Sequence, residues 1–117
     1  MNIVTWNIMG CNNPRNIQTL ARNIRQEKPD ILFLQETKCS FETMQQIGQN
    51  IWKGSKVMAL DVDGMKGGIA ILWQGREVDL MGWRAGHFSL EDEFQILGTE
   101  IRGTIVNIYG SSSLLQK

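Results

Sequence analysis

Glu36 is the residue of this chain that is best placed for metal chemistry, because it follows an apolar run, Pro29 to Leu34, typical of a fully buried strand. A carboxylate at the end of such a strand is held at a sheet edge beside solvent, where a hard cation such as Mg²⁺ could use it. A Glu after a short apolar strand also occurs as a plain solvated end. The residue alone therefore leaves both interpretations open.

The segments around Glu36 alternate between strand and helix patterns. Residues 2–8 alternate apolar and polar side chains, which predicts a strand with one buried face. Apolar residues recur at helical spacing from Asn16 to Lys28, and again from Phe41 to Ile51, so two amphipathic helices are expected. A loop at residues 37–40 would join the buried strand to the second helix.

The rest of the chain is dominated by short strand patterns separated by turns with Gly and Asp. The segments expected to be strands are 56–60, 67–73, 78–83, 88–89, 94–101 and 104–109. A strand-helix-strand-helix start followed by hairpins predicts an α+β fold, with a mostly antiparallel sheet and helices on one face. The four tryptophans lie within apolar segments, so we interpret them as packing residues rather than as base-stacking platforms.

Composition predicts one folded domain without a strong electrostatic preference for a partner. The chain has 117 residues, 42% of them hydrophobic, and twelve basic residues balance twelve acidic ones. Nucleic-acid binding, if present, would therefore need a local arrangement of charges. Without a signal-peptide or spanning pattern, we expect no membrane association and an intracellular location, cytoplasmic or nuclear.

The two cysteines, Cys11 and Cys39, are expected to be free thiols in a reducing compartment. A disulfide between them and metal binding are the alternatives. A single histidine and the lack of a CxxC spacing argue against a zinc site.

Four segments in this order resemble the endonuclease/exonuclease/phosphatase (DNase I-like) superfamily. They are Trp6-Asn7, Gln35-Glu36-Thr37-Lys38, Gly67 to Trp73 (GGIAILW), and Asn107-Ile108-Tyr109-Gly110. Within that superfamily the chain is most similar to the apurinic-endonuclease-like domain at the N-terminus of plant LINE-type retrotransposon polyproteins, where Asn12 to Arg15 also fits the pattern. The resemblance spans about residues 2–113.

The resemblance implies roles for three residues, and a fourth is assigned from its position beside them. In the family, the residues matched by Asn7 and Glu36 bind or orient a divalent ion, Mg²⁺, at the active site, and the residue matched by Tyr109 contacts the scissile phosphate. Lys38, two residues after Glu36 and next to the candidate site, is the basic residue that we place near a phosphate. A carboxylate can hold Mg²⁺ directly, whereas an amide orients groups without repelling phosphate.

The same resemblance also implies that the catalytic set is incomplete. The family's domain is a four-layered α/β sandwich whose later half carries GDFN and SDH segments, and this sequence contains neither of them. Its one histidine, His87, stands in no SDH context and is interpreted as a loop or strand-end residue. We therefore interpret residues 1–117 as a single truncated domain that supplies the first half of the DNase I-like sandwich.

Three functional hypotheses follow. The favoured one is a catalytically incomplete protein that acts through protein binding or self-association, using a sheet face that the second half of the sandwich would otherwise cover. The alternative is a Mg²⁺-dependent endonuclease acting on DNA, with two half-sites meeting in a dimer. The third is a fragment without independent function. Whether the chain is an enzyme is left open by the sequence.

Overall fold

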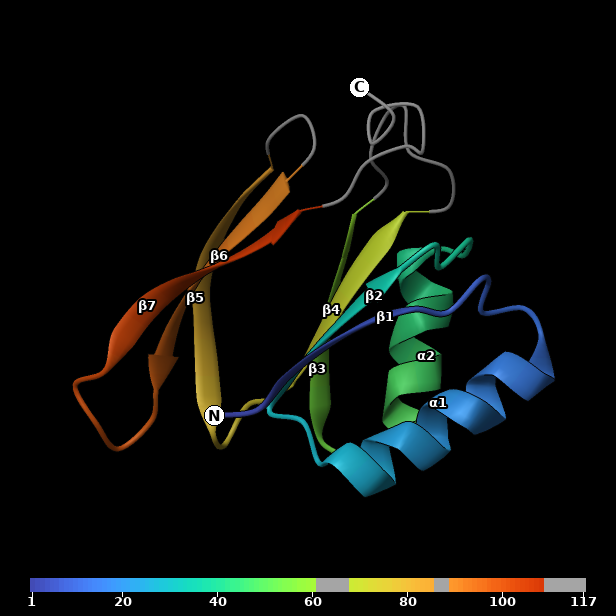
Figure 1. The fold of residues 1–117 in the computed structure, drawn as a ribbon, viewed down its shortest axis with the longest axis horizontal. Coiled ribbons are helices and arrows are strands. Elements are labelled where there is room, and N and C mark those ends of the chain that lie inside the picture. The colour runs from blue at the N-terminus through green and yellow to red at the C-terminus, as the bar shows by residue number, and fades with distance from the viewer. Residues whose placement is uncertain (61–67, 86–88, 109–117) are drawn as a thin grey trace. The chain divides into compact units, whose positions relative to one another are not determined.

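The computed structural model describes residues 1–60, 68–85 and 89–108, and Figure 1 shows them as a ribbon. The chain divides into two compact units, Met1–Gly75 and Arg76–Lys117. The helices of the described residues lie in the first unit, and both units contain a sheet, so the predicted α+β class is confirmed. Tyr109 and His87 lie outside the described residues.

The first unit contains a four-stranded sheet and two helices in the predicted strand-helix-strand-helix order. Its elements are β1 (Ile3–Asn7), α1 (Pro14–Glu27), β2 (Ile31–Gln35), α2 (Phe41–Ile51), β3 (Ser55–Leu60) and β4 (Ile69–Gln74). The strand order is β1-β2-β4-β3. Strand β1 pairs with β2 in parallel, and the other two pairings are antiparallel. The parallel pairing requires a crossover connection, which α1 supplies.

Both helices begin at side chains that cap their free backbone N–H groups. The Asn13 side chain accepts a hydrogen bond from the Arg15 N–H, and Pro14 occupies the first turn, where a missing N–H costs nothing. Ser40 caps α2 in the same way by accepting from the Thr43 N–H. Within the described residues, no helix is long and apolar enough to cross a membrane.

The core of the first unit lies between the two helices and one face of the sheet. Both helices lie on the same side of the four-stranded sheet (Figure 1). The buried side chains of this core include Leu20 and Ile24 of α1, Met44 of α2, Leu32 and Leu34 of β2, and Ala70 and Leu72 of β4. Because strand side chains alternate between faces, the intervening residues Ile31, Phe33, Ile69 and Ile71 point the other way, and they are buried as well. Burial on both faces explains why β2 and β4 are continuous apolar runs in the sequence.

The second unit is a three-stranded antiparallel sheet with the order β5-β6-β7. Its strands are β5 (Val78–Ala85), β6 (Ser89–Ile96) and β7 (Arg102–Ile108). The expectation of two separate strand segments at 88–89 and 94–101 is wrong, because one strand runs through the acidic stretch from Glu91 to Glu93. Acidic residues are unfavourable in strands, but here Arg84 of β5 forms a cross-strand ion pair with Glu91 at 2.7 Å.

Asp92 of β6 is the most unusual residue of the second unit. It is fully buried, and neither of its carboxylate oxygens has a hydrogen-bond partner in the part of the chain that the structure describes. Burial disfavours the charged form and raises the pKa of Asp92 to about 6. The folded protein therefore binds a proton at Asp92 more tightly than the unfolded chain does, and ionisation of Asp92 opposes folding.

The substitution Asp92→Asn is expected to stabilise the protein above about pH 6, by about 1 kcal/mol after allowance for solvent screening. The unfolded chain has the ordinary Asp pKa of 3.8, so the destabilisation by Asp92 grows as the pH rises from about 4 through 6. The difference in free energy of unfolding between Asp92→Asn and wild type should therefore be larger at pH 7.5 than at pH 4.5, as measured by urea denaturation. Glu93→Gln, on the exposed neighbour, is the control, and an equal effect of both variants at both pH values would contradict the assignment.

Candidate functional site

The parallel pairing of β1 and β2 brings two of the predicted site residues to the same edge of the sheet. Asn7, the last residue of β1, is the register partner of Gln35, the last residue of β2, and Glu36 follows directly. Lys38 lies two residues further along. We call Asn7, Glu36 and Lys38 the strand-end site.

The two chain segments continue side by side after the strands end. The Ile8 N–H donates to the Gln35 carbonyl at 3.1 Å, the Gly10 N–H to the Glu36 carbonyl at 2.8 Å, and the Cys11 N–H to the Thr37 carbonyl at 2.8 Å. Gln35 thus sits between β1 and β4, with Ile69 as its register partner on the other side. The backbone of the strand-end site is therefore held by hydrogen bonds on a rigid sheet.

Both segments contain residues in the left-handed backbone region. Met9, Glu36 and Lys38 have φ angles of 56°, 55° and 54°, and Gly10 has a φ of 99°. For a residue with a side chain this conformation costs roughly 1 kcal/mol or more, so the surrounding contacts must hold it in place. At Glu36 it turns the chain out of the strand direction immediately after β2.

The polar groups of the strand-end site differ in what they contact. The Glu36 carboxylate is partly buried and makes no hydrogen bond or ion pair within the described chain. The Asn7 side chain is exposed, and its Oδ1 atom accepts a hydrogen bond from the Met9 N–H at 3.0 Å. Asn7 thus stabilises the turn after β1, which is a common structural use of Asn. Its amide nitrogen and a second lone pair of Oδ1 are not used by that bond.

Lys38 extends toward the loop after β1. Its Cδ atom lies 3.7 Å from the position that a Cβ atom on Gly10 would occupy, which is ordinary van der Waals contact. The side chain of Lys38 is exposed, so its ammonium group remains in solvent beside the two strand ends. Tyr109, the fourth residue that the sequence predicts for the site, lies outside the described residues.

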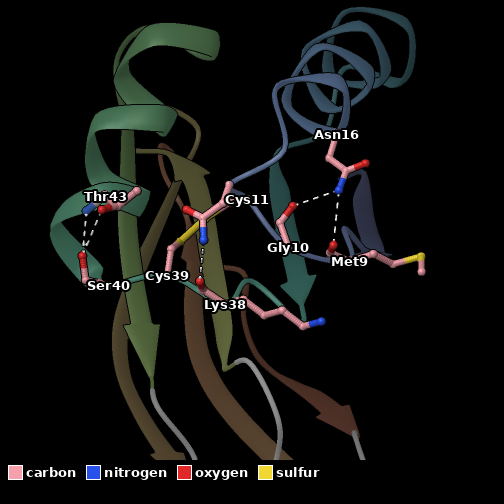
Figure 2. Close-up of a disulfide and its surroundings, with 9 residues drawn as sticks. Met9, Gly10, Cys11, Asn16, Lys38, Cys39, Ser40 and Thr43 are labelled. Carbon is pink, nitrogen blue, oxygen red and sulfur yellow. Dashed lines mark hydrogen bonds between the residues drawn. A yellow bond between two sulfur atoms is a disulfide. The ribbon is translucent and has the colours of Figure 1, made fainter.

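A disulfide joins the two loops of the strand-end site. Cys11 and Cys39 are bonded through their sulfur atoms, with their Cα atoms 6.4 Å apart (Figure 2). The expectation of free thiols is therefore wrong in this structure. Sequence alone does not reveal the pairing, because the cysteines are 28 residues apart and meet only once β1 and β2 are paired.

Sequence reasoning missed Asn16 and Asn12, which hold the same loops. The Asn16 Nδ2 atom donates to the Met9 carbonyl at 3.2 Å and to the Gly10 carbonyl at 2.9 Å, as Figure 2 shows. The Asn12 Nδ2 atom donates to the Lys38 carbonyl at 3.3 Å. The available signal was the cluster of Asn residues around Pro14 at a helix start, since Asn commonly bonds to backbone groups there.

The donor set of the strand-end site is compatible with Mg²⁺ in type but small in number. Carboxylate and amide oxygens are ligands that Mg²⁺ accepts, and the Glu36 oxygens have no competing partner in the described chain. Magnesium requires six ligands in octahedral geometry. Within the described residues, no group of three or more His, Cys, Asp or Glu side chains could hold a metal ion. Water or another molecule would have to complete the coordination.

The fold and the strand-end site define an α+β protein that presents amide and carboxylate groups at the ends of two paired strands. The model of the endonuclease/exonuclease/phosphatase family matches residues 4–86, which is more than half of the chain. The chain therefore belongs to this family. The match includes Asn7, Glu36 and Lys38. No protein of curated function matches the sequence.

Solved structures share the fold. A mannosyl-6-phosphatase from Bacteroides thetaiotaomicron is 14% identical with a TM-score of 0.70, and the alignment covers 91% of this chain and 50% of that one. An AP endonuclease from Leishmania major is 19% identical with a TM-score of 0.63, covering 97% of this chain and 42% of that one. D. rerio TDP2 complexed with a single-strand DNA product is 14% identical with a TM-score of 0.64, covering 97% and 48%. This chain thus spans about half the length of these proteins.

The substitution Asn16→Ala is expected to loosen the loop after β1. It removes two hydrogen bonds worth about 1 kcal/mol each and returns about 0.6 kcal/mol of helix propensity, so a net loss of about 1 kcal/mol is expected. Amide hydrogen exchange should accelerate at Gly10 and Cys11, whose N–H groups bond across to the loop after β2. Gln18→Ala, at an exposed position of the same helix, should leave both exchange rates unchanged. Identical rates in Asn16→Ala and wild type would contradict this role.

Proposed function

We propose that the strand-end site is one half of a metal-dependent phosphoester site, and that the chain alone acts through self-association rather than hydrolysis. The observation that carries the proposal is the placement of Asn7 and Glu36 at neighbouring ends of paired parallel strands in a chain of this family. The finer proposal of descent from a plant LINE-type endonuclease is supported by the sequence segments around these residues.

Each residue would have a distinct task. Glu36 would provide a negatively charged oxygen ligand to Mg²⁺, which, when bound, polarises phosphoryl oxygens as a Lewis acid. Asn7 would orient a water or phosphate oxygen through its amide without adding negative charge that repels the substrate. The Lys38 ammonium group, exposed beside the strand ends, would attract the phosphate group.

Hydrolysis needs more groups than the strand-end site contains. A phosphoester hydrolase requires a nucleophilic water, a group that accepts its proton, and stabilisation of the developing charge. One carboxylate, one amide and one ammonium supply only part of this set, and the sequence contains no GDFN or SDH segment. We therefore expect the chain by itself to bind a divalent cation weakly and to turn over phosphoesters slowly or not at all.

Self-association is supported by apolar side chains exposed on the second unit. Trp83 is 52% exposed, Val106 50% and Met81 43%. Trp83 is opposite Asp92 and Val106 is opposite Glu91, which are consecutive residues of β6, so the two apolar side chains project from opposite faces of the sheet. Aromatic residues are enriched in the buried cores of protein interfaces, so Trp83 is the side chain on this sheet that we expect to anchor a contact. A second copy of the chain is the partner that we propose for this sheet.

The substitution Trp83→Ser should weaken self-association. Wild-type protein is expected to be a dimer in size-exclusion chromatography with light scattering, and removal of this exposed aromatic side chain should raise the dissociation constant by about tenfold or more. Phe41→Ser, which removes a similarly exposed aromatic from the first unit, is the matched control and should leave the dimer intact. Far-UV circular dichroism would verify that both variants are folded. A wild-type monomer at all accessible concentrations would contradict the proposal.

A second candidate function is a Mg²⁺-dependent endonuclease assembled from two copies. It is favoured by the fold shared with an AP endonuclease and with TDP2 in complex with single-strand DNA. Two chains, each about half the length of those proteins, could bring two strand-end sites to one substrate.

Nicking of supercoiled plasmid and cleavage of an abasic oligonucleotide would test this candidate. Mg²⁺-dependent product should appear with wild type and fall by about 100-fold or more in Glu36→Ala, since a lost metal ligand removes several kcal/mol of transition-state stabilisation. Glu42→Ala, at an exposed acidic residue of α2, should retain wild-type activity. Equal product from wild type and Glu36→Ala would exclude the endonuclease hypothesis and leave self-association unaffected.

A further inference from the structure

We propose that the Cys11–Cys39 disulfide is a reversible redox switch that sets the conformation of the strand-end site and thereby its affinity for a divalent cation. The claim that the disulfide sets the conformation of the site rests on the position of the bond and on the two loops that it joins. The part that concerns cation affinity rests on the proposed function of Glu36 and Asn7.

The position of the disulfide carries the inference. Cys11 itself makes the last of the backbone hydrogen bonds between the loops after β1 and β2, because its N–H donates to the Thr37 carbonyl at 2.8 Å. Cys39 comes two residues after Thr37 on the opposite loop. The bond therefore closes the open end of the paired segments that begin at Asn7 and Gln35 (Figure 2). The segments 8–10 and 36–38 are therefore held by strand pairing at one end and by the disulfide at the other.

The segment inside this closure contains the residues whose backbone conformation needs support. Met9, Glu36 and Lys38 all have positive φ angles and lie between the strand ends and the disulfide. Without the bond, the loops would be joined by a few backbone hydrogen bonds and by the contact from Asn12 to the Lys38 carbonyl. The two loops would then have access to conformations in which Met9, Glu36 and Lys38 leave the left-handed backbone region.

The disulfide also lies next to the starts of both helices. Asn13, the cap of α1, comes two residues after Cys11, and Ser40, the cap of α2, directly follows Cys39. The disulfide therefore limits how far the two capping residues, Asn13 and Ser40, can move apart. Loosening it would affect the first turns of α1 and α2 and the strand-end site, and Cys11 would stay among the buried residues of the core.

The redox step is thiol–disulfide exchange with a dithiol. A thiolate of the dithiol attacks Sγ of Cys39, the less buried partner, and the S–S bond breaks to release Cys11 as a thiolate that takes up a proton. The second thiolate of the dithiol then attacks the mixed disulfide and releases Cys39, which is protonated in turn. The protein gains two electrons and two protons, and the dithiol becomes a cyclic disulfide.

The partial exposure of Cys39 favours a switch over a permanent crosslink, because a dithiol can reach its Sγ atom. The bond itself is not required to build this core, because Cys11 is only one member of a cluster that also contains apolar side chains from both helices and from β2 and β4. Its location at the strand ends points to control of the site rather than to overall stabilisation.

Hydrogen exchange and a Mg²⁺ titration, both followed by NMR, test the two parts separately. In wild type, reduction with dithiothreitol should accelerate amide exchange at Gly10 and Cys11 by about tenfold or more and leave exchange in β2 unchanged. The apparent dissociation constant for Mg²⁺, followed at the Asn7 and Glu36 resonances, should rise by about fivefold or more on reduction. The double variant Cys11→Ser/Cys39→Ser should match reduced wild type and should not respond to dithiothreitol.

The outcomes separate this inference from the proposed function. Two thiols reactive toward iodoacetamide in the air-equilibrated, denatured protein would overturn the switch, and so would exchange rates at Gly10 and Cys11 that do not respond to reduction. If exchange responds but Mg²⁺ affinity is equal in both redox states and weaker in Glu36→Gln, coupling to the cation is overturned and the conformational part is supported. If Glu36→Gln binds Mg²⁺ as wild type does, the proposed metal site fails, while the exchange data still decide the switch.

Discussion

The parallel pairing of β1 with β2 is the constraint on which the rest of the first unit depends. A parallel pair cannot be closed by a tight turn, so the chain must return through a crossover, and α1 is that crossover. The same pairing makes both strands end at one edge of the sheet, which places Asn7 beside Gln35 and Glu36. It also brings Cys11 opposite the segment that carries Cys39. One register, that of the parallel pair β1–β2, thus determines where the strand-end site, its loops and the disulfide lie.

Burial on two faces is what makes this pairing stable. Leu32 and Leu34 point toward the helices, whereas Ile31 and Phe33 point the other way, and all four are essentially inaccessible. Each such side chain contributes up to roughly 3 kcal/mol when it is transferred from water into the core. A strand anchored in this way does not shift register easily, since a slip of one residue would exchange its two sets of contacts. The polar residues at its end are thus held on the most rigid element of the unit.

Elements with a strong periodicity are predictable from the sequence for physical reasons. Spacing of about 3.6 residues indicates both helices, and the continuous apolar run from Ile31 to Leu34 indicates a buried strand. The prediction fails at β6, because the pairing of Glu91 with Arg84 depends on a neighbour in space rather than on local preference. It also favours free thiols over the disulfide and misses the contacts of Asn16, because these interactions exist only after β1 and β2 have met. The position of Glu36 is accessible from sequence, whereas the contacts that hold its backbone are not.

The backbone conformation of Glu36 bears on the two interpretations of this residue. A solvated strand end needs no particular conformation, and an extended or right-handed residue would serve there at no cost. Glu36 instead has a φ of 55°, and its carbonyl accepts a hydrogen bond from Gly10, so the chain turns sharply at this residue while staying bound to the β1 loop. Left-handed residues with side chains persist only where their surroundings hold them, and they gather at functional sites. Met9 in the loop after β1 and Lys38 in the loop after β2 have the same left-handed conformation. The concentration of this strain beside a carboxylate that has no partner in the described chain favours a site whose geometry is held for a ligand over a strand that simply ends.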